Sequence, residues 1–478
     1  MISHARVRQL SAGLLAAWLA ACGAPRSSPG SSAEHGLAGS PEATARPGRT
    51  FYVTAVRDGQ VGSGTAVDPY RKLADAIRAA GSGSTILLDR GIHFASPTQA
   101  TDTTCGNCGD AEFRGDIPIT VGFRIADKAL TLKGEDREQT ILFTGAGYGV
   151  WFEHAGESRL ENLRISGGRR DADGHATDAA VVIKYSHVTM SRVDLVDNDN
   201  LYAGTPDPVV GVAGVAVREG ATLDIDHSRI LDASWDGIAV YRSDPQVPGS
   251  TAVLRASDNL IACTRDCVRK AGRGVGIGIT WDSRAFVRNN EVHHYWKGIG
   301  AFGDSVVTIE NNYVHDQHGW GIAVAGNAHA DVRNNFIHHN GTAGLSAWEG
   351  GVSGSFVNNA VVANGWQPRE WVGKNTGIWL NSTAIEPSYN LLWMNQPVDA
   401  CSGGEPGSTA CTELAMIGQR GNRRDDPRLA ADFMPGEGSP VIDSGDPAVH
   451  DGDGSRSDIG LRGGPAAAWD PPSAPSTP

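Results

Sequence analysis

The sequence predicts an all-β solenoid, a fold in which short strands stack coil upon coil around one long core. Three observations predict it: a pattern that recurs about every 23 residues, short β-branched segments that alternate apolar and polar residues, and turn residues between these segments. Glycine is abundant, with 61 in 478 residues, as expected of a chain with many tight turns. Because the repeat contains strands and no helical periodicity, we expect stacked β coils rather than paired helices.

An Asn-Asn pair marks the repeat most clearly, and in three of its four copies an apolar residue and a histidine follow two positions later. The first asparagine recurs at Asn289, Asn311, Asn334 and Asn358, and a Gly-Ile or Gly-Leu pair follows in each copy. We expect the paired amides to hydrogen-bond from coil to coil, with coils about 4.8 Å apart. Fainter copies extend the predicted solenoid from about residue 84 to 400.

The first 49 residues predict export and a lipid anchor. Residues 1–21 combine two arginines with a short apolar stretch, which is typical of a signal peptide and too short to span a bilayer. The ending Leu-Ala-Ala-Cys resembles a bacterial lipobox and implies acylation of Cys22, and Gly23 after it favours the outer membrane. A plain secretory signal with an incidental cysteine is the alternative. Residues 22–49 are rich in small and polar residues and predict a flexible tether.

Both ends of the predicted solenoid need covers, because exposed strand edges pair with other chains. At the N-terminal end, Asp68 and the proline after it predict the start of a capping helix that stops at Gly81. At the other end, the turn-rich segment 439–460 predicts a short closing structure. The β-helix domain with these covers is predicted over residues 50–464, and residues 465–478 are predicted to be a disordered tail.

The cysteines and the net charge narrow the class of protein. The formal net charge of −13 argues against nucleic-acid binding, because a basic surface is needed to neutralise phosphates. We also expect a monomer. Besides Cys22, six cysteines form three close pairs, which in an exported chain predict disulfides that pin loops: Cys105 with Cys108, Cys263 with Cys267, and Cys401 with Cys411.

Several stretches outside the repeat carry a family resemblance. Phe51-Tyr52-Val53 and residues 68–80, 85–91 and 453–460, taken with the Asn-Asn and Gly-Ile coils, resemble proteins of the pectin-lyase-like superfamily. The resemblance implies a single-stranded, right-handed parallel β-helix with an N-terminal capping helix. It also implies activity on polysaccharides as a lyase, hydrolase or epimerase. The sequence lacks the full residue set of polygalacturonases, so pectin hydrolysis of that type is not expected.

Turn lengths predict where a ligand binds. The turn after the Asn-Asn strand is short in three central coils, at residues 294–297, 316–320 and 339–343. Long loops leave the same turn in other coils, at residues 199–212, 263–275 and 364–376. Short turns between long loops predict a trough, which suits an extended polysaccharide.

The side chains predicted at this trough combine bases, cations and aromatic platforms. Alternation from buried Val292 and Val314 points His293 and His315 outward on successive coils. Elimination on a uronate needs a base for the C5 proton and a cation for the carboxylate, and tryptophans suit the faces of sugar rings. The predicted catalytic candidates are Lys270, Lys297, His293 and His315, and the predicted substrate-binding residues are Arg269, Arg273, Trp296, His318, Trp320, His338, Trp366, Trp371 and Lys374.

These residues favour a lyase over a glycoside hydrolase, acting on an anionic polysaccharide. One alternative is a noncatalytic module in which the trough holds a glycan or a partner protein. Another is periplasmic metal delivery through His293, His315 and His338. No cofactor is certain. Ca²⁺ held by an acidic row that includes Asp282 and Asp304 suits a uronate ligand, although turn formation is the commoner role of such residues.

Overall fold

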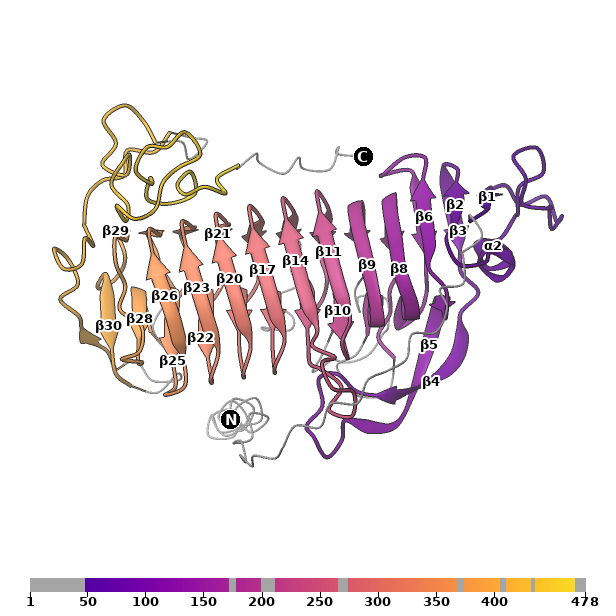
Figure 1. Ribbon diagram of the computed structural model, residues 1–478, viewed down its shortest axis with the longest axis horizontal. Coiled ribbons are helices and arrows are strands. Elements are labelled where there is room, and N and C mark those ends of the chain that lie inside the picture. The colour runs from indigo at the N-terminus through magenta and orange to yellow at the C-terminus, as the bar shows by residue number, and fades with distance from the viewer. Residues whose placement is uncertain are drawn as a thin grey trace, which may run out of the picture.

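Short segments of alternating apolar residues form three strands in each coil, and the coils stack into a long parallel β-helix (Figure 1). The computed structural model describes residues 48–171, 178–198, 211–264, 274–367, 374–404, 410–430 and 435–468. Strands of successive coils pair in parallel register, which confirms the all-β solenoid that the repeat predicts. In these ranges, no helix is long and apolar enough to cross a membrane.

Each coil contributes one strand to each of three sheets that run along the molecule, and two long strands, β8 (Tyr148–Ser166) and β9 (Ala179–Val196), pass through all three. The first sheet contains β1 (Thr50–Val53), β2 (Ser84–Leu88), β6 (Leu130–Gly134), β11 (Thr222–Asp226), β14 (Val253–Ser257), β17 (Arg284–Arg288), β20 (Val306–Glu310), β23 (His329–Arg333) and β26 (Ser353–Val357). The second sheet contains β3 (Gly91–Phe94), β7 (Thr140–Phe143), β12 (Arg229–Leu231), β15 (Leu260–Ala262), β18 (Glu291–His293), β21 (Tyr313–His315), β24 (Phe336–His338), β27 (Ala360–Val362) and β29 (Leu391–Trp393). The third sheet contains β5 (Arg114–Ala126), β10 (Ala213–Arg218), β13 (Ile238–Val240), β16 (Val275–Ile279), β19 (Lys297–Ala301), β22 (Trp320–Ala325), β25 (Ala343–Trp348), β28 (Thr376–Leu380) and β30 (Ala400–Ser402).

The inward side chains of the three sheets form one continuous core. In the second sheet, Val292, Val314 and Ile337 occupy equivalent positions in successive coils, and each is fully buried. Burying an aliphatic side chain of this size contributes about 1.5–3 kcal/mol. Because the inward positions repeat in every coil, the outward positions on either side of them also repeat, and they form straight rows along the molecule.

Buried asparagines form a ladder at the corner between the first and second sheets. Asn335 accepts hydrogen bonds from the backbone and side-chain amides of Asn312, at 2.9 and 3.0 Å. Its own amide donates to Ile309 O and to Asn359 Oδ1. The coil-to-coil pairing of amides that the repeat predicts is therefore confirmed. The described ladder consists of Asn259, Asn290, Asn312, Asn335, Asn359, Asn390 and Asn422.

We expect Asn335→Ala to lower the free energy of unfolding by roughly 2–4 kcal/mol, because each buried polar group left without a partner costs roughly 1–3 kcal/mol. The donors of Asn312 and the carbonyl of Ile309 lose their partner in this variant. Denaturant unfolding followed by circular dichroism measures the change. The control is Asn327→Ala, which removes an exposed asparagine bonded to Asp304, and equal stabilities of the two variants would contradict the role of the ladder.

The capping helix is present, but it begins later than predicted. Helix α2 spans Leu73–Ala79 and buries Leu73, Ala76 and Ile77 against the core. It does not start at Asp68, because Tyr70 is held in an extended conformation in which it exchanges backbone hydrogen bonds with β1. Strand β1 pairs in parallel with β2, so the parallel stacking begins at Thr50 rather than near residue 84.

Two segments cover the sides of the coils. The C-terminal segment 435–468 does not simply close the end, because Val441, Ile459 and Leu461 pack on Tyr313 and Phe336 of the second sheet. Figure 1 shows its loops in yellow beside the last coils. Strand β4 (Thr98–Thr104) pairs antiparallel with β5, and this hairpin covers the third sheet near its start. The two-residue strand β31 (Thr412–Glu413) pairs antiparallel with β30.

The described disulfides match the predicted pairs. Cys105 is bonded to Cys108, and Cys401 is bonded to Cys411. Cys263 is also a disulfide cysteine, and its predicted partner Cys267 lies outside the described residues.

Candidate functional site

A row of three imidazoles lies on the outer face of the second sheet. His293, His315 and His338 occupy the same register position in β18, β21 and β24. The rings of His293 and His315 stack with centroids 4.8 Å apart, and the ring of Tyr313 stacks on His315 with centroids 3.8 Å apart. The outward orientation predicted from alternation is thus found, although His315 is only 8% exposed because its neighbours cover it.

A second row follows where each of these strands ends. His294, Asp316 and His339 each adopt a left-handed backbone conformation, with φ of 62°, 51° and 51°, which turns the chain toward the third sheet. Asp316 Oδ2 accepts a hydrogen bond from His315 Nδ1 at 2.7 Å, and its Oδ1 accepts one from His339 Nδ1 at 2.5 Å. One carboxylate therefore orients imidazoles from two coils.

Glu291 and Trp366 complete this site. Glu291 Oε1 lies 3.2 Å from His315 Nε2, and the ring of Trp366 stacks on His339 at 5.3 Å while its Nε1 donates to His339 O. Trp366 is 39% exposed, which suits the aromatic platform predicted for it. We define the histidine corner as Glu291, His293, His294, His315, Asp316, His338, His339 and Trp366.

Burial and hydrogen bonding shift the pKa values of the imidazoles of the corner in opposite directions. Burial lowers the pKa of His293 to about 3 and that of His338 to about 4. Burial also opposes protonation of His315, but its hydrogen bonds to Asp316 and Glu291 outweigh this effect and raise its pKa. Burial raises the pKa of Asp316, but hydrogen bonds to His315 and His339 hold it below its usual range. The corner thus places imidazoles whose pKa values are lowered beside one whose pKa is raised.

Sequence reasoning did not assign Glu291, Asp316 or His339 to the site. Each could have been found from the repeat. Glu291 lies two residues before His293, so it shares that residue's face of the strand. Asp316 and His339 occupy the position after the histidine in successive coils, where the turn begins.

Two predicted binding residues are buried and do not face a ligand. Trp320 is 5% exposed because it packs against Trp296 and Trp348 on the third sheet. Lys374 is fully buried, with its ammonium donating to Ala410 O and lying 5.5 Å from the Trp379 ring. Neither side chain is exposed as the sequence led us to expect, because aromatic residues of neighbouring coils cover Trp320 and contacts with Ala410 and Trp379 hold Lys374 inside.

The other predicted residues are placed as follows. Trp296 and His318 are half-buried in the turns between the second and third sheets. Lys297 begins β19, with its ammonium 5.4 Å from the Trp320 ring, and so belongs to the third sheet rather than to the histidine corner. Predicted residues that lie outside the described part of the chain are Cys22, Arg269, Lys270, Arg273 and Trp371.

The acidic row considered for Ca²⁺ forms turns in the structure. Asp282 accepts a hydrogen bond from the Ser243 amide at 2.9 Å, and Asp304 accepts one from the side chain of Asn327 at 2.8 Å. Among the described residues, the one group of three metal-binding side chains close enough to share an ion is Glu291, His293 and His315.

A buried carboxylate lies near Lys297 on the outer face of the third sheet. Burial raises the pKa of Asp236 to about 7. The hydrogen bond from the Val275 amide and the charge of Lys297 both lower this pKa, but burial has the larger effect. Burial raises the pKa values of Tyr241 and Tyr295, and the charge of Asp236 raises both further.

We expect Asp236→Asn to stabilise the protein at pH 8 by at least about 1 kcal/mol, since one pKa unit corresponds to about 1.4 kcal/mol. A folded-state pKa raised above the unfolded value means that native stability falls as pH rises from about 4 through about 7. The asparagine variant lacks this loss, so the two proteins should have similar melting temperatures at pH 4 and diverge toward pH 8. A constant difference across this range would contradict the raised pKa.

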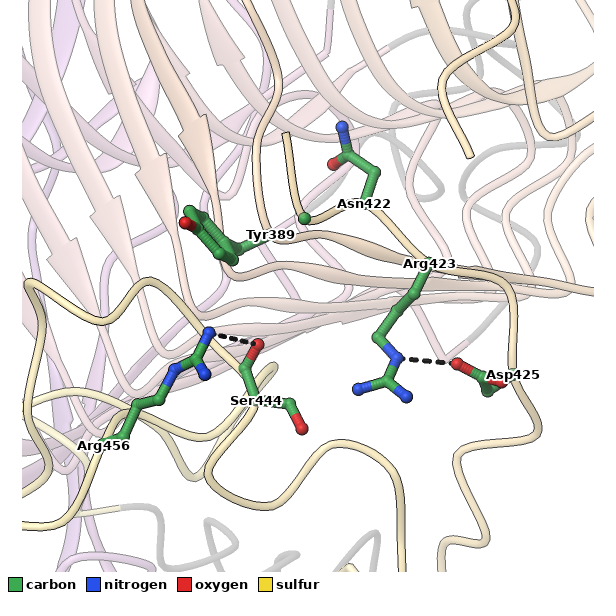
Figure 2. Close-up of a pocket in the computed structure, with 7 residues that line it drawn as sticks. Tyr389, Asn422, Arg423, Asp425, Ser444 and Arg456 are labelled. Atoms are coloured by element: carbon green, nitrogen blue, oxygen red, sulfur yellow. Dashed lines mark hydrogen bonds and ion pairs between the residues drawn. The ribbon is translucent and has the colours of Figure 1, made fainter. Parts of the chain in front are cut away.

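A separate pocket lies between the last coils and the C-terminal segment (Figure 2). Its volume is about 330 Å³, and Arg423 and Arg456 line it with Tyr389, Asp425 and Ser444. Arg423 donates to Asp425 at 2.6 Å and to Pro440 O at 2.8 Å, so its guanidinium joins the C-terminal segment to the coils. None of the predicted site residues lines this pocket.

Comparisons with known proteins find one matching family and several similar solved structures. Residues 213–390 match the family described as "Right handed beta helix region". No curated protein matches the sequence. Among solved structures, the pectate lyase Pel9A is 14% identical and the match covers 87% of this chain and 97% of that one, with a TM-score of 0.42. The periplasmic alginate epimerase AlgG is also 14% identical, with coverage of 64% and 82% and a TM-score of 0.37.

An alginate lyase from Paenibacillus sp. str. FPU-7 is 13% identical, with coverage of 76% of this chain and 99% of that chain and a TM-score of 0.35. Residues 213–390, which match the family model, contain every residue of the histidine corner. The fold is therefore a right-handed parallel β-helix.

Proposed function

We propose that this protein binds an extended, anionic polysaccharide along the histidine corner and cleaves it by β-elimination, with His339 as the base. The observation that carries the proposal is the pair of hydrogen bonds through which Asp316 holds His315 and His339. A carboxylate that accepts Nδ1–H fixes the tautomer of an imidazole and leaves Nε2 free to accept a proton. The His339 side chain is 46% exposed, so a ligand has access to it.

The shape of the corner suits an extended ligand. Its two rows run along the molecule across three coils, and Trp366 extends them by one more coil. A polysaccharide lying along the rows would meet the same chemical groups at a constant spacing, and Trp366 offers a ring face to a sugar.

The carboxylates of the corner favour elimination over hydrolysis. A glycosidase needs one carboxylic acid to protonate the leaving oxygen and a second carboxylate across the sugar. Glu291 and Asp316 both accept hydrogen bonds from His315, so they are engaged in orienting imidazoles. An oriented imidazole base acts on a carbon acid, and the C5–H beside a uronate carboxylate is such an acid.

In the proposed reaction, His339 Nε2 takes the C5 proton and the electron pair of that bond forms the C4–C5 double bond. The C4–O bond breaks, its oxygen leaves with the electron pair, and water supplies the proton that this oxygen takes up. The predicted cations that would neutralise the uronate carboxylate, Arg269 and Arg273, lie outside the described residues and stay predictions.

Absorbance at about 235 nm from the unsaturated product tests the proposal. Alginate, pectate and glycosaminoglycans are incubated with the protein, and a neutral glucan is the control substrate. We expect absorbance to rise with one of the anionic polymers. If a polymer binds but neither absorbance nor new reducing ends appear, the protein is a noncatalytic binding module and the lyase proposal fails.

We also propose that the protein is exported and anchored through Cys22. The disulfides at Cys105–Cys108 and Cys401–Cys411 support an oxidising compartment. Acylation of Cys22 stays a prediction from the sequence.

A further inference from the structure

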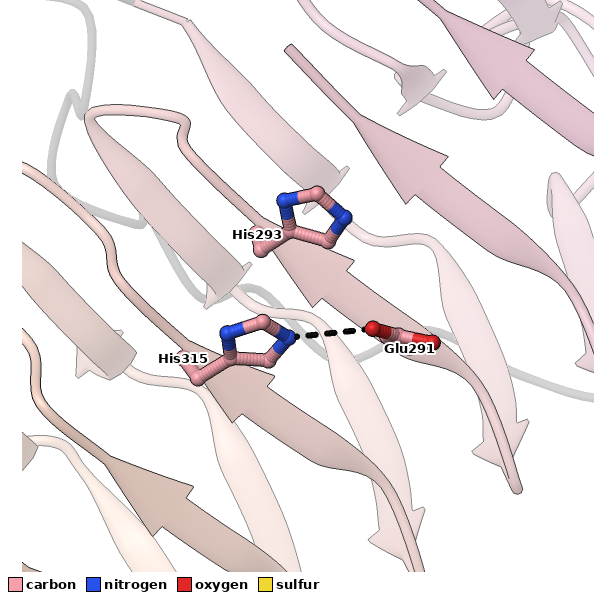
Figure 3. Close-up of side chains that lie close together, drawn as sticks. All are labelled: Glu291, His293 and His315. Carbon is pink, nitrogen blue, oxygen red and sulfur yellow. Dashed lines mark hydrogen bonds and ion pairs between the residues drawn. The ribbon is translucent and has the colours of Figure 1, made fainter. Parts of the chain in front are cut away.

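Three potential metal ligands converge on two adjacent coils of the second sheet. Glu291 and His293 lie on β18 and His315 lies on β21, and one ligand atom from each lies within 4.8 Å of the others. Figure 3 shows the two imidazole rings one above the other, each presenting a nitrogen on the side of Glu291. The planes of the rings differ by 23°.

The contacts of these imidazoles place one nitrogen of each on the side of Glu291, and a bound ion would replace the proton that His315 Nε2 donates to this carboxylate. His293 Nδ1 is engaged with His294 Nδ1 at 2.6 Å, so the other nitrogen of His293 is the one on the Glu291 side. His315 Nδ1 is engaged with Asp316, and its Nε2 lies 3.2 Å from Glu291 Oε1. Each imidazole thus uses one nitrogen for the protein and directs the second toward the same carboxylate.

The surroundings of His315 resemble the outer sphere of a metal site. A metal-bound histidine commonly donates its other N–H to a carboxylate, which fixes the ring and strengthens the ligand. Asp316 occupies that place here. The ring of Tyr313, which the C-terminal segment covers, stacks on His315 at 3.8 Å and restricts its rotation.

We propose that Glu291, His293 and His315 bind a divalent transition-metal ion, with Zn²⁺ as the best fit. Two imidazoles and one carboxylate are ligands that Zn²⁺ prefers, whereas Ca²⁺ and Mg²⁺ prefer oxygen ligands throughout. Bonds of about 2.0–2.2 Å require the ligand atoms to close together, and rotation of the half-buried Glu291 and His293 side chains supplies this movement. Three protein ligands leave one tetrahedral position open to water or another oxygen donor.

This inference goes beyond the proposed polysaccharide activity and does not depend on it. His339, the proposed base, belongs to another coil and is not one of the three ligands. Metal binding is therefore measured without any polysaccharide, and each proposal can fail while the other stands.

The test uses the disulfide-bonded chain with Zn²⁺ alone as the probe. We expect about one Zn²⁺ per chain after dialysis, measured by mass spectrometry of the metal, and a visible spectrum of tetrahedral Co²⁺ on cobalt substitution. The variant E291Q/H293Q/H315Q should lose both signals. Asp316→Asn, which alters a positioning residue, should weaken Zn²⁺ binding about 10–100-fold in a competition assay and retain the Co²⁺ spectrum.

The matched control is His329→Gln, which removes an imidazole that lies on the first sheet and is 47% exposed. It should bind Zn²⁺ as the native chain does. Circular dichroism checks that the triple variant is folded, and His293→Gln alone replaces it if it is not. No Zn²⁺ retained by the native chain, or equal retention by the ligand variants and the control, would overturn the proposal.

Discussion

His339→Gln is expected to slow the release of unsaturated uronate about 10²–10⁴-fold, the range lost when a general base is removed. Glutamine can still form hydrogen bonds to Asp316, but it has no group that takes up a proton near neutral pH. Because Trp366 and the other corner residues remain, we expect the loss in kcat with little change in KM. Initial rates at about 235 nm over a range of polymer concentrations separate the two constants.

His329→Gln is the matched control for this prediction as well. The His329 side chain is 47% exposed and that of His339 is 46% exposed, so the two substitutions remove imidazoles of similar accessibility. His329 lies on β23 of the first sheet, away from the corner. Equal slowing by both variants would indicate a general effect on the fold, and undiminished turnover by His339→Gln would exclude His339 as the base.

The features that repeat along the chain are the ones that sequence reasoning predicts well. The parallel coils, the asparagine ladder and the row of His293, His315 and His338 each follow from a local period and from strand alternation. The same period also places Asp316 and His339 in one row of turn residues. It does not reveal that one carboxylate orients imidazoles of two coils, because that depends on side-chain rotamers.

Contacts between distant segments are not predictable in this way. The C-terminal segment packs on Tyr313 through Val441 and Ile459. These two residues lie outside the repeat, so the period of the sequence does not predict their contact with Tyr313. Trp320 was expected at the surface because it follows a short turn, but the aromatic side chains of neighbouring coils bury it. The hairpin of β4 and β5, which covers the third sheet, was not predicted from the sequence either, because it does not belong to the repeat.

This hairpin is held by a buried network of charges centred on Arg218. Arg218 Nη2 donates to Thr104 O at 2.6 Å, and Nη1 donates to Tyr148 Oη at 2.8 Å and lies 3.2 Å from Asp102. Arg218 Nε donates to Glu219 at 2.8 Å. Asp102 and Thr104 lie on β4 and Arg218 lies on β10, so the network joins the hairpin to the coils.

We expect Arg218→Met to lower the free energy of unfolding by about 3–5 kcal/mol, because removing one partner of a buried ion pair leaves an uncompensated charge. Glu219, which is fully buried, loses its hydrogen-bonded cation, while Asp102 keeps Lys184. Denaturant unfolding measures the loss, and limited proteolysis detects whether the hairpin separates first.

Arg255→Met is the control for Arg218→Met, because Arg255 forms an exposed ion pair with Asp224, a kind of pair that contributes about 0–1 kcal/mol. If Arg218→Met destabilises no more than this control, the hairpin must be held by its apolar contacts. Those contacts, made by Ile117 and Ile119 against Ala213 and Ala239, are non-directional and do not set a register. A large loss in the Arg218 variant therefore identifies the buried charges as the interaction that fixes where the hairpin lies on the third sheet.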